Sequence, residues 1–392
     1  MIASSPLLWD GLSLLAADRA LHAGLGERRA SFEFSVAEMP RHTGFLVAAG
    51  LEEAAAMLAR PAPSEDDVRR AQRAVGFHDD LARRLATGIS ALDMDAVPEG
   101  TPIFAGAPLA SIDGPLVEAL LACAVIAPIL KRAVEIATRA ARLHLAAGGG
   151  LLIDGSATRA SSVPEALAIA RAAHVGGAAA TTSAVAASQL GIPFRGEAML
   201  DFGGLSAAGL RAEDGWGPPD RLVALAGVDE EAQLVEAHRL DVRASGWIAL
   251  GLAASGVSIA LRHEVVALEQ EGAWVPRRGL SDRADVLPGR KIVARYLDAD
   301  SRAVADVVHL AHERMRSPRG LGAARLLPLA RAVLRNGRAL EAPEAPRAGR
   351  ERSVSGRHQL PASVTYLHAP APYRVEPSPA VVQLRDADPR RP

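Results

Sequence analysis

The sequence predicts an α/β protein, and the stretch from 151 to 194 carries that prediction. A short apolar run at 151–154 precedes a helical segment at 163–174, and a second short helix leads to another apolar run at 192–194. Strands and helices that alternate with short connections are typical of parallel sheets, so we interpret this stretch as part of a β/α barrel. The chain has 392 residues, 49% of them hydrophobic, which suffices for two or three domains.

The first hundred residues combine short strands with helices. Residues 31–36 alternate apolar and polar side chains, which favours a half-buried strand. Residues 44–58 are apolar and Ala-rich and predict a helix. Ser64 precedes three acidic residues, an arrangement that caps a helix and complements its dipole. A strand-like stretch at 99–112 follows.

A long helical region is expected over 114–148, with a kink or a break at Pro128. Its most apolar part, at 119–130, is about a dozen residues long, whereas a membrane span needs roughly twenty. We therefore interpret it as a buried core helix. Cys123 lies within it with no histidine beside it, which indicates a buried structural thiol.

The remaining elements are predicted from caps, periodicity and polarity. Ser162 begins a capping box with a proline in the first turn, so a helix should start there. Residues 201–220 are loop-like, and 229–240 have the periodicity of an amphipathic helix. Residues 257–261 alternate as a strand, and the polar stretch at 342–357 is expected to be an exposed linker.

Charge and cysteine content exclude several classes of protein. The 44 basic residues are balanced by 45 acidic ones, which argues against a nucleic-acid scaffold. A single cysteine excludes a disulfide framework and any Cys-rich zinc site. The acidic and histidine residues at 300–312 match no metal-ligand spacing, so no protein-bound metal is expected. The first residues lack the pattern of a signal peptide, and we expect a cytoplasmic protein without a membrane segment.

One group of residues in the predicted barrel suits an anion. Arg159, the pair Gly176 and Gly177, and the hydroxyls at 181–183 all lie at the ends or starts of predicted elements. Loops after barrel strands form the ligand face, and helix starts rich in glycine and hydroxyls bind phosphate. Serines and threonines are also ordinary caps, and glycines end ordinary helices, so both interpretations stay open.

Several short blocks carry a family resemblance. They lie in order at residues 45–52, 99–100, 108–109, 113–116, 137–142, 171–177, 181–183, 191–193, 280–281 and 287–291. The first reads FLVAAGLE, and the block at 171–177 reads RAAHVGG. Together these blocks resemble the nicotinate phosphoribosyltransferase family, which has GFLVAAGLEE and RAAYIGG at these places. The resemblance covers 7–200 and 275–310.

The resemblance implies a type II phosphoribosyltransferase fold, in which an irregular α/β barrel packs on an α/β sandwich. The sandwich would comprise residues 1–112 with 290–392, and the barrel 113–289. Such proteins are usually dimers. They join nicotinate to phosphoribosyl pyrophosphate with Mg²⁺ and couple the reaction to ATP hydrolysis. The site must hold phosphates and stabilise a departing anion, a task that suits arginines and backbone N–H groups.

Several family positions are replaced in this chain. The family's early tyrosine aligns with Leu12, and its paired arginines align with Thr158 and Arg159, so one arginine remains. The asparagine of the family's TSN block is Ser183. The histidine that takes phosphate from ATP aligns with Leu200, which cannot accept a phosphoryl group. The resemblance therefore implies a reaction without ATP coupling.

Further replacements lie toward the end of the predicted barrel. Two family lysines align with Gly279 and Ala284, and Arg278 and Arg283 stand one position earlier as substitutes. The stretch from 200 to 275 is shorter than expected for the family. At least one β/α unit is therefore expected to be missing or reshaped.

Three hypotheses follow from the resemblance. The first is a phosphoribosyltransferase of NAD biosynthesis, a homodimer that acts on nicotinate or a related pyridine carboxylate. Its phosphate-binding residues would be Arg159, Gly176, Gly177, Thr181, Thr182, Ser183 and Arg195, with Arg278 and Arg283 as alternates. The second is a non-catalytic paralogue that serves as a binding or assembly subunit. The third, a quinolinate-type transferase, needs a basic pocket for two carboxylates, and too few basic positions converge to prefer it.

Overall fold

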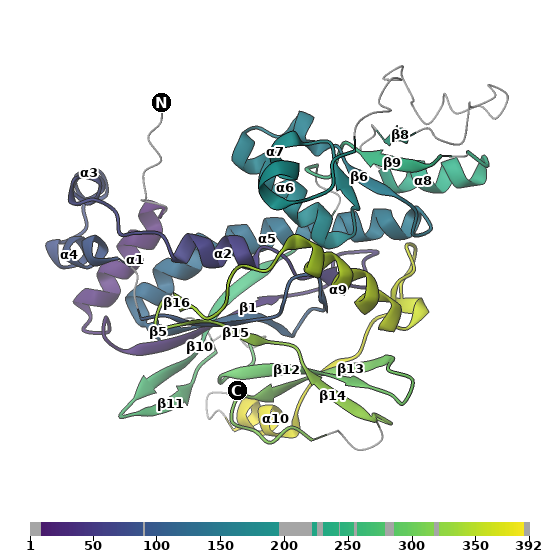
Figure 1. Ribbon diagram of the computed structural model, residues 1–392. Helices are drawn as coiled ribbons and strands as arrows, with labels where there is room; N and C mark the ends of the chain where they lie inside the picture. Colours follow the sequence, from purple (N-terminus) through teal and green to yellow (C-terminus); the bar gives the residue numbers. More distant parts are fainter. Residues whose placement is uncertain are drawn as a thin grey trace.

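In the part of the chain that the structure describes, the strands form four sheets around one long central helix (Figure 1). This computed structural model describes residues 9–88, 91–195, 222–225, 230–242, 244–254, 257–278, 286–316 and 321–387. None of the helices in those ranges is both long enough and apolar enough to cross a membrane.

The largest sheet has seven strands, and each pair of neighbours in it runs antiparallel. In spatial order they are β11 (Ala273–Pro276), β10 (Leu261–Gln270), β1 (Arg29–Val36), β5 (Pro108–Pro115), β3 (Asp93–Ala96), β15 (Arg331–Arg335) and β16 (Arg338–Ala339). The strand expected at 31–36 is thus confirmed as an interior strand between β10 and β5, where Phe32 and Phe34 are buried. The domain division at residue 289 stays a prediction, although β10 and β11 pair in the same sheet as β1.

Helix α5 (Leu116–Ala146) joins the two main cores of the molecule and crosses its centre in Figure 1. Its first half packs Cys123 and Ile126 against the seven-stranded sheet. Its second half packs Ala137 and Ala140 into the core of the parallel sheet. The buried thiol is confirmed. Of the kink or break expected at Pro128 the break is wrong, because Pro128 lies inside one continuous helix, where Ile126 and Leu130 are buried in the core.

A parallel sheet of four strands lies beyond the second half of α5 (Figure 1). Its order is β7 (Ala180–Thr181), β6 (Leu152–Asp154), β9 (Gly246–Ala249) and β8 (Leu222–Leu225). The helices around it are α6 (Val163–Gly176), α7 (Ala184–Leu190) and α8 (Glu230–Arg239), together with the 3₁₀ turn η1 (Ser156–Arg159). Phe194 extends the sheet through an isolated parallel bridge to Thr181. The expected parallel β/α arrangement is confirmed here.

A second four-stranded sheet forms the lower part of the molecule in Figure 1. It consists of β14 (Arg325–Pro328), β12 (Lys291–Leu297), β13 (Ala303–Leu310) and β17 (Val375–Pro377), followed by α10 (Pro379–Asp386). Arg295 donates to both carboxylate oxygens of buried Asp306, each at 2.8 Å. Asp306 is one of the acidic and histidine residues at 300–312 that were considered as metal ligands. It forms an ion pair with Arg295 on the neighbouring strand.

Three helices at the amino-terminal side form a small unit with its own apolar core. They are α1 (Gly11–His22), α3 (Glu65–Val75) and α4 (Asp79–Thr87). Leu14, Val68 and Leu81 pack in this core against Leu121 of α5. The predicted cap is confirmed, because the Ser64 hydroxyl accepts a hydrogen bond from the backbone N–H of Asp67.

The helix expected at 44–58 is shorter in the structure. Its first part forms β2 (Leu46–Val47), which pairs with β4 (Pro102–Ile103), and α2 spans only Leu51–Leu58. Gly50 has φ 87°, a left-handed conformation that ends the helix on its amino-terminal side. Its N–H donates to Glu99 Oε1 at 2.9 Å, so a residue 49 positions away holds the helix start.

Two other expectations about local structure are wrong. The polar stretch at 342–357 is mostly the helix α9 (Pro346–Gln359) and not an exposed linker. It packs on α6 through polar groups, with Arg357 donating to the carbonyl of Gly176 at 2.7 Å. The strand expected at 257–261 begins only at Leu261, because Ile259 N–H donates to the Glu135 side chain instead of to a neighbouring strand. Residues 201–220 lie outside the described ranges.

Candidate active site

The carboxyl ends of the parallel strands bring polar residues from distant parts of the chain together. Asp154 ends β6 and Thr181 ends the adjacent β7. Thr181 Oγ1 donates to Asp154 Oδ2 at 2.9 Å, and the backbone N–H of Ser156 donates to Asp154 Oδ1 at 3.0 Å. In α/β folds this end of the strands is where ligands bind.

The Asp154 carboxyl is almost fully buried, and that burial sets its acidity. Only 1% of the residue is exposed. Burial raises the pKa of the Asp154 carboxyl, and the hydrogen bonds from Ser156 and Thr181 partly offset the rise. Asp154 therefore positions the neighbouring loop and threonine, while its own oxygens are turned away from solvent.

The hydroxyl residues after β7 separate into two roles. Thr181 Oγ1 accepts from the Ser183 N–H at 3.1 Å, and Ser183 Oγ accepts from the Ala186 N–H at 3.2 Å as the cap of α7. The capping interpretation therefore applies to Thr181 and Ser183, whose hydroxyls form hydrogen bonds with other groups of the protein. Thr182 is half-buried between them. Arg195 lies alongside, since its backbone N–H donates to the carbonyl of Thr181 at 3.1 Å.

Arg159 supplies positive charge at the same end of the sheet. It ends the 3₁₀ turn that follows β6, and its side chain is exposed. Burial raises the pKa of the Glu230 carboxyl and the charge of Arg159 opposes that rise, so the two side chains are electrostatic neighbours. An exposed guanidinium can bind an anion such as phosphate through two parallel hydrogen bonds.

Glu230 is a buried acid that sequence reasoning missed. It begins α8, and only 1% of it is exposed. Glu230 Oε1 accepts from the Gly251 N–H at 2.6 Å, and Oε2 accepts from Arg139 Nη2 at 3.3 Å. Burial raises the pKa of its carboxyl, and these two donors oppose the rise. No local sequence motif identifies Glu230, because its partners Gly251 and Arg139 lie 21 and 91 positions away.

Other predicted site residues lie elsewhere. Gly176 and Gly177 end α6 at the opposite end of β7, where the carbonyls of both accept hydrogen bonds from arginines of α9. They precede β7, whereas Thr181–Ser183 lie at its carboxyl end, and their place in the phosphate site stays a prediction. Arg278 donates to the backbone carbonyl of Arg385 in α10, far from β6 in Figure 1. The group at β6 and β7 therefore retains Arg159, Thr181, Thr182, Ser183 and Arg195.

Several positions singled out in the sequence fall outside the described residues. They are Leu200, Gly279, Arg283 and Ala284. Leu12, at the position of the family's tyrosine, is 81% exposed on α1. Figure 1 places α1 across the molecule from β6, so within one chain Leu12 does not join this group.

The described carboxylates do not fit a directly bound Mg²⁺. This ion prefers exposed oxygen ligands and keeps several waters. Asp154 and Glu230 are buried, and each of their four carboxylate oxygens already accepts a hydrogen bond from the protein. Within the described ranges, the barrel end thus offers positive charge and hydroxyls to an anion and no open carboxylate to a metal.

Comparison with known proteins gives partial sequence matches. A nicotinate phosphoribosyltransferase of Mycobacterium tuberculosis is 32% identical over 173 residues, which is 44% of this chain and 37% of that protein. The Bacillus subtilis nicotinate phosphoribosyltransferase is 31% identical over 173 residues, 44% of this chain and 35% of its own length. The match thus spans little more than a third of these relatives. No protein-family model matches the chain.

The structural comparison extends over nearly the whole chain. Human nicotinic acid phosphoribosyltransferase superimposes with a TM-score of 0.73 and 21% identity, covering 97% of this chain and 99% of that one. The chain is thus similar to nicotinate phosphoribosyltransferases in sequence over 44% of its length and in fold over nearly all of it. A nicotinate-nucleotide pyrophosphorylase of Pyrococcus furiosus matches with a TM-score of 0.64, 16% identity and coverage of 89% and 94%. These similarities confirm the predicted type II phosphoribosyltransferase fold.

Proposed function

We propose that this chain transfers the phosphoribosyl group of phosphoribosyl pyrophosphate to nicotinate or a related pyridine carboxylate, as a step of NAD biosynthesis. The observation that carries the proposal is the position of Arg159. Arg159 is exposed and follows the carboxyl end of β6, and Thr182 and Arg195 come at the same end of the adjacent β7. Preorganised positive charge at this edge would stabilise the departing pyrophosphate.

The matching relatives are named nicotinate phosphoribosyltransferases, which supports this substrate class. The replaced positions support a reaction that does not use ATP. With Leu200 in place of the phosphate-accepting histidine, the transfer would proceed without ATP coupling. Glycosyl transfer itself needs no phosphohistidine. Because the described carboxylates are already hydrogen-bonded, Mg²⁺ would enter with the diphosphate of the substrate and leave with pyrophosphate. A cytoplasmic homodimer remains part of this proposal.

A product assay tests the proposal. Purified protein is incubated with phosphoribosyl pyrophosphate, Mg²⁺ and a panel of pyridine carboxylates, with and without ATP, and mononucleotides are separated by chromatography. The expected result is a mononucleotide whose yield does not depend on ATP. A correctly folded protein that forms no product with any pyridine would refute the proposal and favour a non-catalytic paralogue.

Arg159→Ala tests the site within the same assay. Loss of a charged hydrogen bond should weaken the affinity for phosphoribosyl pyrophosphate by about 1.5–3 kcal/mol. Arg347→Ala is the matched control, because Arg347 is an exposed arginine of α9 whose side chain pairs with Glu351 along the same helix. Equal affinities in the Arg159 variant and the control would remove Arg159 from the binding site.

A further inference from the structure

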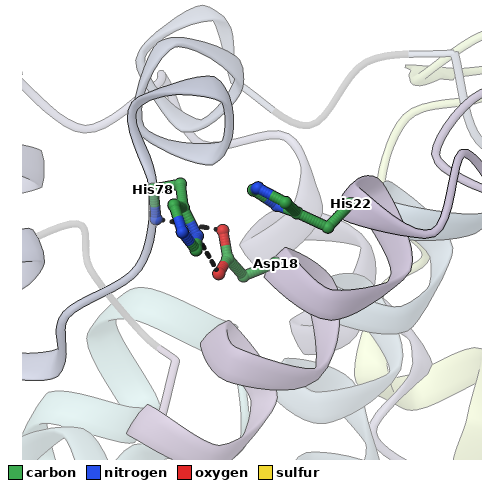
Figure 2. Close-up of side chains that lie close together, drawn as sticks. All are labelled: Asp18, His22 and His78. Atoms are coloured by element: carbon green, nitrogen blue, oxygen red, sulfur yellow. Dashed lines mark hydrogen bonds and ion pairs between the residues drawn. The ribbon is translucent and has the colours of Figure 1, made fainter.

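A compact cluster of metal-binding side chain types lies in the amino-terminal helical unit, away from the barrel strands (Figures 1 and 2). Asp18 and His22 stand one turn apart on α1, and His78 precedes α4. One potential ligand atom from each of the three lies within 4.8 Å of the others. Figure 2 shows both imidazoles close to the Asp18 carboxylate, which is hydrogen-bonded to His78.

The carboxylate at the centre of the cluster is held in place. Asp18 is buried, with its Oδ1 accepting from the backbone N–H of His78 at 3.0 Å and its Oδ2 2.8 Å from His78 Nδ1. The rings of His22 and His78 are exposed, and their centroids are 4.0 Å apart. A fixed anion is thus flanked by two imidazoles that solvent and a metal ion can reach.

We propose that Asp18, His22 and His78 form a site for a divalent transition metal ion, with Zn²⁺ as the fitting ion. Zinc binds imidazole nitrogen and carboxylate oxygen at about 2.0–2.2 Å, which separates tetrahedral ligands by about 3.3 Å. Asp18 Oδ2 and His78 Nδ1 are 2.8 Å apart and all three ligand atoms lie within 4.8 Å, so the two exposed histidine side chains can rotate to meet that separation. Three protein ligands leave a fourth position for water.

The donor set also says which ions the site would reject. Two nitrogen donors and one oxygen donor suit zinc and its neighbours in the transition series, whereas Mg²⁺ prefers oxygen ligands throughout. The ion bound here would therefore differ from the Mg²⁺ that would accompany phosphoribosyl pyrophosphate. The proposed zinc site does not depend on the proposed reaction.

Metal binding would join two helices that the chain separates by 56 residues or more. His22 lies in the last turn of α1, and His78 immediately precedes Asp79, the first residue of α4. Both helices already share an apolar core with α3 and α5. A bound ion would add a cross-link on the exposed side of that core and stabilise the start of α4 against local opening.

Binding of Zn²⁺ to the metal-free full-length protein tests the proposal. Titration calorimetry should give one zinc per chain, unaffected by excess Mg²⁺. His22→Gln and His78→Gln should each weaken zinc binding at least about tenfold. Both histidines are exposed, so the variants should fold, which circular dichroism checks. His368→Gln replaces an exposed histidine outside the cluster and should bind zinc as the wild type does.

A second measurement reports the cross-link itself. In the wild type, zinc should slow amide hydrogen exchange at the end of α1 and the start of α4, and in His22→Gln it should not. Absence of saturable zinc binding would overturn the proposal, as would equal affinity in the wild type and both cluster variants. Zinc binding without any change in exchange at these helices would also overturn it.

Discussion

Acidification should destabilise this chain through two buried histidines at the ends of neighbouring helices. His144 lies in the last turn of α5 and accepts a hydrogen bond at Nδ1 from Arg357 Nη2 at 3.1 Å. His174 lies in the last turn of α6. Burial, together with the charges of Arg357 and Arg350, lowers the pKa of His144 to about 4, and burial with the charge of Arg350 lowers that of His174 to about 4.

The size of the effect follows from proton linkage. A histidine in the unfolded chain has a pKa of about 6.5, so the folded values are depressed. The stabilisation is present above pH 6.5 and is lost as the pH falls toward 4. Between pH 7.5 and 5.5, each histidine should cost about 1.3 kcal/mol of unfolding free energy, or about 2.6 kcal/mol for both.

Urea unfolding of the wild type and of His144→Gln at the two pH values isolates this contribution. The glutamine side-chain oxygen can accept from Arg357 at either pH, so the variant should lose about 1.3 kcal/mol less than the wild type on acidification. Buried Asp154 and Glu230 act in the opposite direction in both proteins and cancel from the difference. His368→Gln should behave as the wild type does. An identical pH dependence in wild type and His144→Gln would refute the reasoning.

Two further substitutions test packing and charge around the parallel sheet. A Cβ at Gly176 would lie 2.2 Å from the carbonyl oxygen of Ala137, so Gly176→Ala should lower the unfolding free energy by about 1–3 kcal/mol, whereas Gly11→Ala, with contacts of 3.7 Å, should be near neutral. Equal midpoints in urea for the two variants would contradict the close approach of α5 and α6. Glu230→Gln should cost about 3 kcal/mol because it leaves buried Arg139 without its anion, while Glu236→Gln, at a partly exposed carboxylate paired with exposed Arg239, should cost much less. Similar losses in these two variants would show that the buried pair is not specially stabilising.

Local hydrogen bonding explains which elements could be predicted from the sequence. The starts of α3, α6 and α7 depend on Ser64, Ser162 and Ser183, each of which accepts from a backbone N–H three positions later. Strand β6 is apolar because it is buried between helices, and its run ends visibly at Asp154. Such signals lie within a few residues of one another, so the chain shows them without its fold.

Elements that depend on distant partners could not be predicted in this way. Helix α9 has no apolar face, and it forms because Ser353 and Arg357 donate to the carbonyl of Gly176 on α6. Helix α2 starts at Gly50, which Glu99 holds. In both cases the stabilising group is supplied by another element, and polar composition alone indicates a linker.

The candidate sites divide along the same line. Arg159 and the hydroxyls at 181–183 were visible because the residues that follow predicted parallel strands share one edge of a sheet. Glu230 with Arg139, and Asp18 with His78, were not, since 91 and 60 positions separate the partners along the chain. Periodicity and caps report contacts within a turn or a strand, whereas charge pairing and metal-ligand geometry arise only when the helices pack and bring those partners within a few ångströms.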